Sequence, residues 1–112
     1  MGYDVHITRA AKWFDSESAP ISLPEWLAVV SSDCDLRQDA QNGPHDFLCV
    51  TKDGILIGSL WWNEGRIYTK NPNRAMVRKM LEIATHLGAI VQGDNCEVYP
   101  SLDHWPDRGV HE

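Results

Sequence analysis

The sequence predicts an α+β fold, a mainly antiparallel sheet of about five or six strands with two helices packed on one face. Three observations predict it. The chain opens with alternating polar and apolar residues, it contains two segments with helix-capping signals, and three β-rich runs joined by short turns lie between those segments. In this element order the helices pack together against one side of the sheet.

Residues 3–9 are predicted to form a half-buried strand, because polar and apolar side chains alternate along them and successive side chains of a strand point to opposite faces. Each face would carry three residues, Tyr3, Val5 and Ile7 on one and Asp4, His6 and Thr8 on the other. A polar connector over residues 15–20 follows.

Ser22 and Glu25 have the spacing of a capping box, and Pro24 is tolerated in a first helical turn. They predict a helix from Leu23 to residue 31 or 32. Helical periodicity gives it a buried face of four residues, Leu23, Trp26, Leu27 and Val30. We expect a polar loop through residues 33–44.

The middle of the chain predicts a meander of three strands over residues 46–51, 55–62 and 66–70. Gly54 and Gly65 end the short turns between them, where a positive φ is needed. Both faces of the central strand are largely apolar, so it is either covered on both sides or exposes an interaction surface. The alternation places Trp61 and Trp62 on opposite faces.

Asn71 as N-cap and Pro72 at the first helical position predict a second helix that runs to Leu87 and stops at Gly88. Its core stripe would contain six residues, Met76, Val77, Met80, Leu81, Ala84 and Leu87. Strand segments over 89–92 and 96–99 close the fold. We therefore expect one domain over residues 1–99 and a loosely ordered tail over 100–112, which Trp105 could attach to the body.

The composition limits the classes of function. The chain has 112 residues, is 43 % hydrophobic and 23 % charged, and carries a net charge of −6. The acidic charge argues against nucleic-acid binding, and no apolar run is long enough to span a membrane. There is no signal-peptide pattern, and three widely spaced cysteines do not suggest a disulfide framework, so we expect a cytoplasmic protein.

No catalytic residue, metal ligand or cofactor site is assigned. The five histidines lack the spacing that puts two imidazoles on one ion, and the acidic run from Asp33 lacks the glycine and the terminal acid of a calcium loop. Neither a serine elbow nor a phosphate-binding glycine loop occurs. The sequence therefore predicts a protein that is not an enzyme.

Aromatic and acidic residues are the remaining signal. The chain has five tryptophans, more than a core of this size is expected to bury, and exposed indoles beside carboxylates form typical interaction hot spots. Acidic patches steer basic partners. The candidate partner-binding residues are Asp33, Asp35, Asp39, Trp13 and Trp62.

Two stretches carry a family resemblance. One runs from Tyr3 to Arg9 and continues through Trp13 to Trp26, and the other covers residues 71–99. Together they resemble a group of small bacterial proteins, some of which look like immunity partners of polymorphic or secretion-system toxins. The resemblance covers residues 1–99, carries no catalytic signature, and departs from the group in a shorter segment between Asp39 and Phe47.

The resemblance and the composition together predict a cytoplasmic immunity or antitoxin-like protein that binds and occludes a cognate basic toxin, such as a nuclease. Two alternatives stay open. One is a small ligand-binding or enzymatic domain whose pocket on the sheet is lined by Trp61, His6 and Tyr68. The other is a homo-oligomer that buries the apolar strand 55–62 between copies.

Overall fold

The computed structural model describes residues 3–39, 41, 43 and 45–105. These residues form six strands, two α-helices and two 3-10 helices, whose bounds are β1 Asp4–Thr8, η1 Trp13–Ser18, α1 Leu23–Ser32, β2 Leu36–Gln38, β3 Asp46–Val50, β4 Leu56–Asn63, β5 Arg66–Lys70, α2 Arg74–Leu87, β6 Ile90–Gly93 and η2 Leu102–His104.

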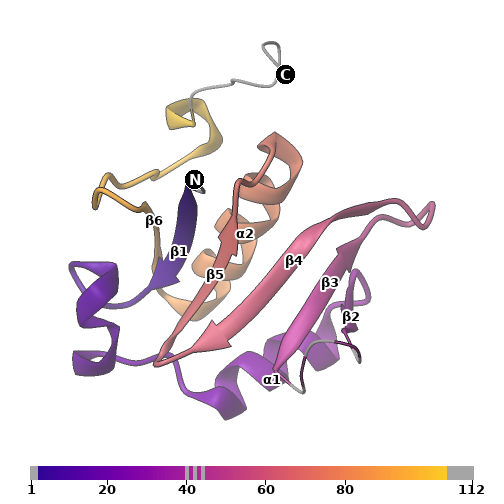
Figure 1. Cartoon of the computed structure of the whole chain (residues 1–112), viewed down its shortest axis with the longest axis horizontal. Helices are drawn as coiled ribbons and strands as arrows, with labels where there is room; N and C mark the ends of the chain where they lie inside the picture. The colour runs from indigo at the N-terminus through magenta and orange to yellow at the C-terminus, as the bar shows by residue number, and fades with distance from the viewer. Residues whose placement is uncertain (1–2, 40, 42, 44, 106–112) are drawn as a thin grey trace.

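The strands form a single antiparallel sheet in the order β2-β3-β4-β5-β1-β6. Helices α1 and α2 lie behind this sheet in Figure 1, on the same face. Side chains of α1 and α2 join the inward residues of the strands in one core cluster, in which Trp26 of α1 packs edge-on against Phe47 of β3. The predicted fold class, an antiparallel sheet with both helices on one face, is confirmed.

The strand register assigns each side chain to a face. Ile7 of β1 lies opposite Val91 and Ile67, and Ile67 lies opposite Trp62, so these four residues form a row across the sheet on the helix-covered face. The adjacent row, on the face away from the helices, consists of Gln92, His6, Tyr68, Trp61 and Asp46. Trp61 and Trp62 therefore lie on opposite faces, as the alternation predicted.

Local sequence signals account for the helix ends. Ser22 and Glu25 form the predicted capping box at the start of α1. Helix α2 ends at Gly88, whose φ of 65° is in the left-handed region that glycine adopts at little cost. Its N-cap is Asn73 rather than Asn71. Asn71 has a positive φ of 51°, and its side-chain oxygen instead accepts a hydrogen bond from the Tyr3 N–H.

The buried face of α1 differs from the predicted one. Trp26 and Val29 are its buried residues, and the predicted Leu23 and Val30 are partly buried against the same core. Leu27 is 39 % exposed, so the predicted face is wrong at Leu27 and omits Val29. In α2, Ile83 is buried and Leu81 only partly buried, a smaller shift of the same kind.

Three segments differ from the predicted secondary structure. Residues 13–18, predicted mainly as a polar connector, form η1, and residues 36–38, predicted as loop, form the edge strand β2. Residues 96–99 make only one isolated bridge, between Val98 and Gln92. Of the predicted tail, residues 100–105 are described, and there Trp105 packs edge-on against Tyr99 with centroids 5.1 Å apart. Residues 106–112 lie outside the described part.

Candidate functional site

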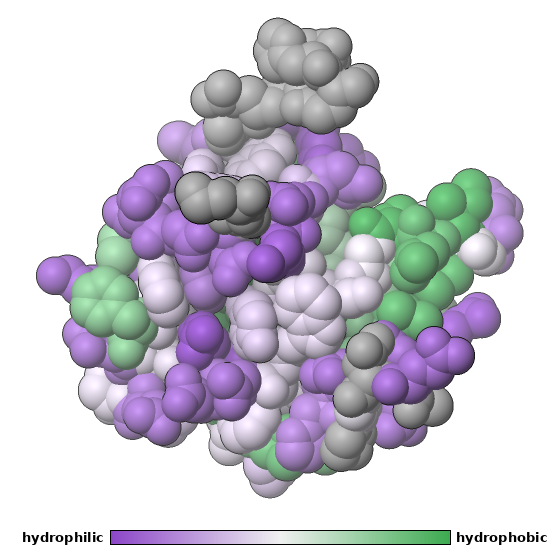
Figure 2. Space-filling model, viewed as in Figure 1, coloured by the Kyte–Doolittle hydropathy of each residue, from purple (hydrophilic) through white to green (hydrophobic). Residues whose placement is uncertain are grey.

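The sheet face opposite α1 and α2, which we call the open face, is the surface seen in Figure 2. No α-helix of the described chain packs on it. Its β1 and β6 side is covered by η1, because Trp13 stacks on His6 with ring centroids 4.2 Å apart. The central part, formed by β5 and β4, carries Tyr68 and Trp61, which are both partly exposed.

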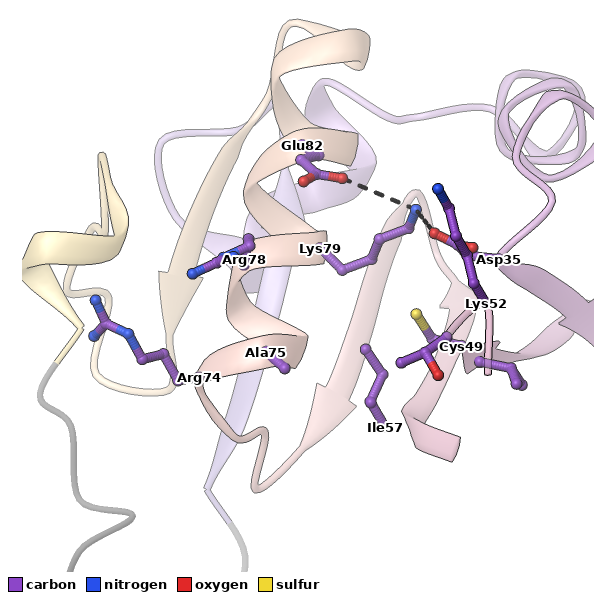
Figure 3. A pocket seen from close by; sticks show the side chains of 11 residues that line it. Asp35, Cys49, Lys52, Ile57, Arg74, Ala75, Arg78, Lys79 and Glu82 are labelled. Atoms are coloured by element: carbon purple, nitrogen blue, oxygen red, sulfur yellow. Dashed lines mark hydrogen bonds and ion pairs between the residues drawn. The ribbon is translucent and has the colours of Figure 1, made fainter. Parts of the chain in front are cut away.

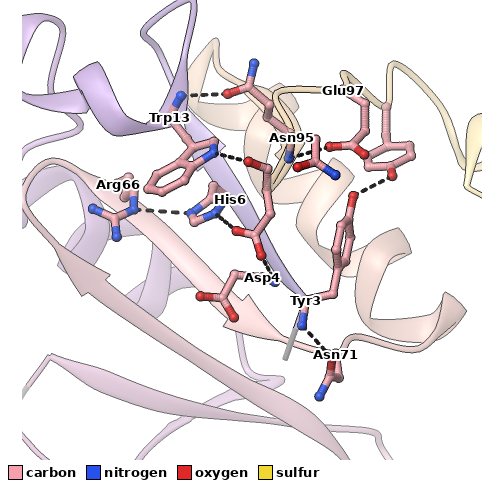
Figure 4. A network of polar contacts seen from close by, with 11 residues as sticks. Tyr3, Asp4, His6, Trp13, Arg66, Asn71, Asn95 and Glu97 are labelled. Carbon is pink, nitrogen blue, oxygen red and sulfur yellow. Dashed lines mark hydrogen bonds and ion pairs between the residues drawn. The ribbon is translucent and has the colours of Figure 1, made fainter. Parts of the chain in front are cut away.

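His6 is the centre of a polar network on this face (Figure 4). Its Nε2 lies 3.1 Å from Asp94 Oδ1, and its Nδ1 accepts a hydrogen bond from Arg66 Nε at 3.2 Å. Arginine can only donate, so Nδ1 carries no proton and Nε2–H donates to Asp94. The geometry thus fixes one neutral tautomer of the imidazole.

Burial and charge both favour that neutral form. His6 is 1 % exposed. Burial lowers its pKa below the ordinary value, the hydrogen bond to Asp94 opposes this shift, and the charge of Arg66 lowers the pKa further. The Arg66 guanidinium lies over the rings of Trp13 and Tyr68, at 5.2 and 4.9 Å from their centroids.

The network fastens η1 to the sheet. The Trp13 backbone N–H donates to Gln92 Oε1 at 2.6 Å, and its indole N–H donates to the Asp94 carbonyl at 3.1 Å. Gln92 in turn donates to the Ala11 carbonyl at 2.9 Å. Both ring nitrogens of His6 are hydrogen-bonded, one to Asp94 and one to Arg66, and Trp13 covers the ring. This arrangement does not present His6 as an accessible base.

Trp61 and Tyr68 form the accessible aromatic centre of the open face. Their ring centroids are 5.3 Å apart with planes tilted by 56°. Asp46 is the direct cross-strand neighbour of Trp61, and Asp4 lies on the same face of β1. Both carboxylates are partly exposed, so the aromatic pair has acidic neighbours on two strands.

The sequence-predicted acidic residues do not form one free patch. Lys79 of α2 lies 2.5 Å from an Asp33 oxygen and 3.3 Å from an Asp35 oxygen, so both carboxylates pair with a lysine that is itself nearly buried. Burial lowers the pKa of Lys79, but the bonds to the two aspartates outweigh burial and leave that pKa raised. Asp39 is 8 % exposed and accepts a hydrogen bond from the Gln41 N–H.

The two predicted tryptophans differ in environment. Trp13 is half-buried in the His6 network described above. Trp62 is half-buried on the helix-covered face, where its indole N–H donates to the Ile21 carbonyl at 2.9 Å and its ring meets His45 edge-on. The structure thus brings Trp13, rather than Trp62, to the open face. Asp33 and Asp35 instead lie together at the Lys79 ammonium, and within the described residues neither has a hydrogen bond or ion pair with Trp13 or Trp62.

Sequence reasoning did not select Arg66 or Asp94 as members of the site. The signal that could have found them is the strand register: Arg66 shares the open face of β5 with Tyr68, and Asp94 directly follows the end of β6. The alternative of a small ligand-binding or enzymatic domain predicts a pocket lined by Trp61, His6 and Tyr68. The structure places them in one cross-strand row, but Trp13 covers His6.

The described residues give little support for a metal site or a reactive thiol. They contain no group of three or more His, Cys, Asp or Glu side chains arranged to hold a metal ion. All three cysteines are free, and burial raises the pKa of the Cys49 thiol to about 11, which keeps it protonated at neutral pH. Within the described ranges, no helix is both long and apolar enough to cross a membrane.

Comparison of the chain with protein-family models, with curated proteins and with solved structures finds no match. The resemblance to immunity proteins accordingly stays a hypothesis.

Proposed function

We propose that this protein is a binding module that inhibits a basic protein partner, in the manner of an immunity protein that occludes a toxin. The observation that carries the proposal is the accessible pair of Trp61 and Tyr68, next to Asp46, at the centre of a sheet face on which no α-helix of the described chain packs. Aromatic centres with a polar, charged surround are the usual anatomy of protein-binding hot spots.

Rigidity of the surface supports this function. Cross-strand pairing holds Trp61 and Tyr68, and Arg66 packs over Tyr68 while it donates to His6. A surface that is already ordered loses less conformational entropy when it binds, so more of its contact energy appears as affinity. The buried His6 network is best understood as the support of this surface.

The acidic charge of the chain supports a basic protein as the partner. The chain has a net charge of −6, and Asp15 and Glu17 of η1 are exposed in addition to the carboxylates beside Trp61. Such a surface accelerates encounter with a basic protein and disfavours an acidic one. We propose action in the cytoplasm, which three free cysteines favour, against a cognate toxin such as a nuclease.

The test is co-expression of the tagged chain with the protein encoded beside its gene, followed by purification of the complex and a growth assay. We expect a stable complex and restored growth. Trp61→Ala should abolish both, and Leu27→Ala is the matched control because Leu27 is an exposed apolar residue of α1, on the other side of the sheet. The proposal would be overturned if the natural chain formed no complex and did not restore growth.

A further inference from the structure

Strand β4 has a free edge. It is eight residues long, but β5 pairs only with Trp61, Trp62 and Asn63. The two strands leave their shared turn and then diverge (Figure 1). On the side of β5, residues 56–60 therefore have no strand partner in the described part of the chain, although β3 pairs with them on the other side.

The same segment lacks the features that normally protect an edge. Residues 54–62 contain no charged residue and no proline. Ile55 and Leu56 are 60 % and 58 % exposed, and Figure 2 shows an apolar patch over the β3–β4 hairpin. Natural proteins usually cover or charge such an edge, because its unpaired N–H and C=O groups accept another strand.

A groove lies beside this edge (Figure 3). It has a volume of about 460 Å³ and runs between the hairpin and α2, with Ile57, Cys49 and Ala75 as apolar lining residues. Ile57 belongs to the unpaired segment, so the groove adjoins the free edge. The volume is sufficient for one or two side chains of an added segment.

The groove lining carries more basic than acidic side chains. Its four cations are Lys52, Arg74, Arg78 and Lys79, and its two acids are Asp35 and Glu82. Lys79 is paired with Asp33 and Asp35, whereas the other three cations are exposed and have no ion pair within the described ranges. The groove of this acidic protein is therefore locally basic.

The geometry points to a second binding site, at which β4 receives an extended segment of a protein partner that combines apolar residues with glutamate or aspartate. An extended backbone is the ligand that supplies a hydrogen-bond ladder to residues 56–60, the groove accepts alternate side chains, and the cations select acidic ones. Neither Trp61 nor Tyr68 lines the groove, and the site does not depend on the function proposed for the open face.

The probe for the test is a short fluorescein-labelled peptide that alternates valine and glutamate, titrated with the full chain and followed by fluorescence anisotropy. Its lysine counterpart tests charge, and a version with proline in alternate positions tests the backbone ladder, because proline lacks the N–H. We expect the valine–glutamate peptide to bind at least about tenfold more tightly than either of the other two, a difference of about 1.4 kcal/mol.

Protein variants locate the site. Lys52→Glu combined with Arg74→Glu should weaken binding about tenfold, since both residues are exposed cations that line the groove. Arg37→Glu and Lys12→Glu together make the matched control, because these residues are exposed cations outside the groove lining. Trp61→Ala should leave peptide binding unchanged, which separates this site from the proposed inhibitor surface.

Hydrogen exchange of the complex supplies the direct readout. The bound peptide should slow exchange at alternate amides within residues 56–60, and sedimentation of the free protein should show a monomer. Absence of peptide binding, equal binding of all three peptides, or protection elsewhere would overturn the proposal. So would a dimer with residues 56–60 protected, because a second copy would then occupy the edge.

Discussion

The imidazole of His6 lies flat against the indole of Trp13, with planes 2° from parallel. This contact joins β1 to the 3-10 helix η1 around a histidine whose two ring nitrogens are both hydrogen-bonded. Because the Nδ1 atom faces a guanidinium N–H, protonation of His6 would place two donors against each other. The network is compatible only with the neutral ring.

Stability should therefore depend on pH through His6. Its pKa in the folded protein lies below the ordinary 6.5, so the unfolded chain takes up the proton more readily. The contribution of neutral His6 is fully present above pH 6.5 and is lost as the pH falls below that value toward the folded-state pKa. The slope that a single group adds is at most about 1.4 kcal/mol per pH unit.

The measurement is the free energy of unfolding by urea from about pH 7.5 to about pH 5. His6→Gln removes the titrating group, and we expect a smaller loss of stability across this range than in the natural protein, whatever its stability at neutral pH. His86→Gln is the control, because His86 is exposed in the last turn of α2. Equal pH dependence in the His6 variant and the natural protein would contradict this account.

The acidic residues of the candidate site make a second prediction. If Asp33 and Asp35 were free surface charges, replacing both with lysine would leave stability nearly unchanged. Both instead pair with Lys79, whose side chain is only 10 % exposed. We expect Asp33→Lys with Asp35→Lys to lower the free energy of unfolding by about 3 kcal/mol, because the nearly buried ammonium loses both partners and gains like charges.

Asp53→Lys with Asp103→Lys makes the same change in net charge at two exposed aspartates that have no ion pair among the described residues. Urea unfolding of both double variants separates the local effect from that of net charge. A similar, small change in the two would mean that the Lys79 cluster contributes little to folding.

Much of the fold could be predicted from the sequence because its signals are local. The capping box at Ser22 and the glycine stop at Gly88 act within one helical turn, and the alternation in β1 needs only neighbouring residues. Strand β2 could not be found in this way. It is three residues long, and it exists because Leu36 pairs with Cys49 of β3.

The candidate site was less predictable, because its contacts join residues far apart in the chain. Lys79 lies 44 positions after Asp35, and Asp94 lies 88 positions after His6. Composition identified the residue types, acids and tryptophans, but it could not show which carboxylates were already paired. It also could not show that Trp13 would cover a histidine, since η1 has no periodic pattern that predicts its position.

The register of α2 gives a third prediction. The sequence placed Leu81 in the core stripe, but Leu81 is only partly buried, whereas Met80 is 0 % exposed. Met80→Ala should lower the free energy of unfolding by about 2–5 kcal/mol, as deletion of a buried side chain does. Leu81→Ala should cost about 1 kcal/mol. Thermal or urea unfolding of the two variants checks the difference, and the reverse order would show that the helix is rotated.

The adjacent tryptophans of β4 test the proposed binding face most directly. Trp61 lies on the open face beside Tyr68, and Trp62 lies on the other face with its indole bonded to Ile21. Trp62→Ala should lower the free energy of unfolding by about 3 kcal/mol, since a packed aromatic side chain and its hydrogen bond are lost. It should affect binding only through stability.

Trp61→Ala should have the opposite profile. We expect little change in the free energy of unfolding and a loss of at least about 2 kcal/mol in the binding of the partner protein, roughly a 30-fold rise in Kd. Urea unfolding and calorimetric titration of both variants give the two quantities side by side. If Trp61→Ala destabilised the fold as much as Trp62→Ala and left Kd unchanged, the aromatic pair would be structural, and the open face would lose its role in recognition.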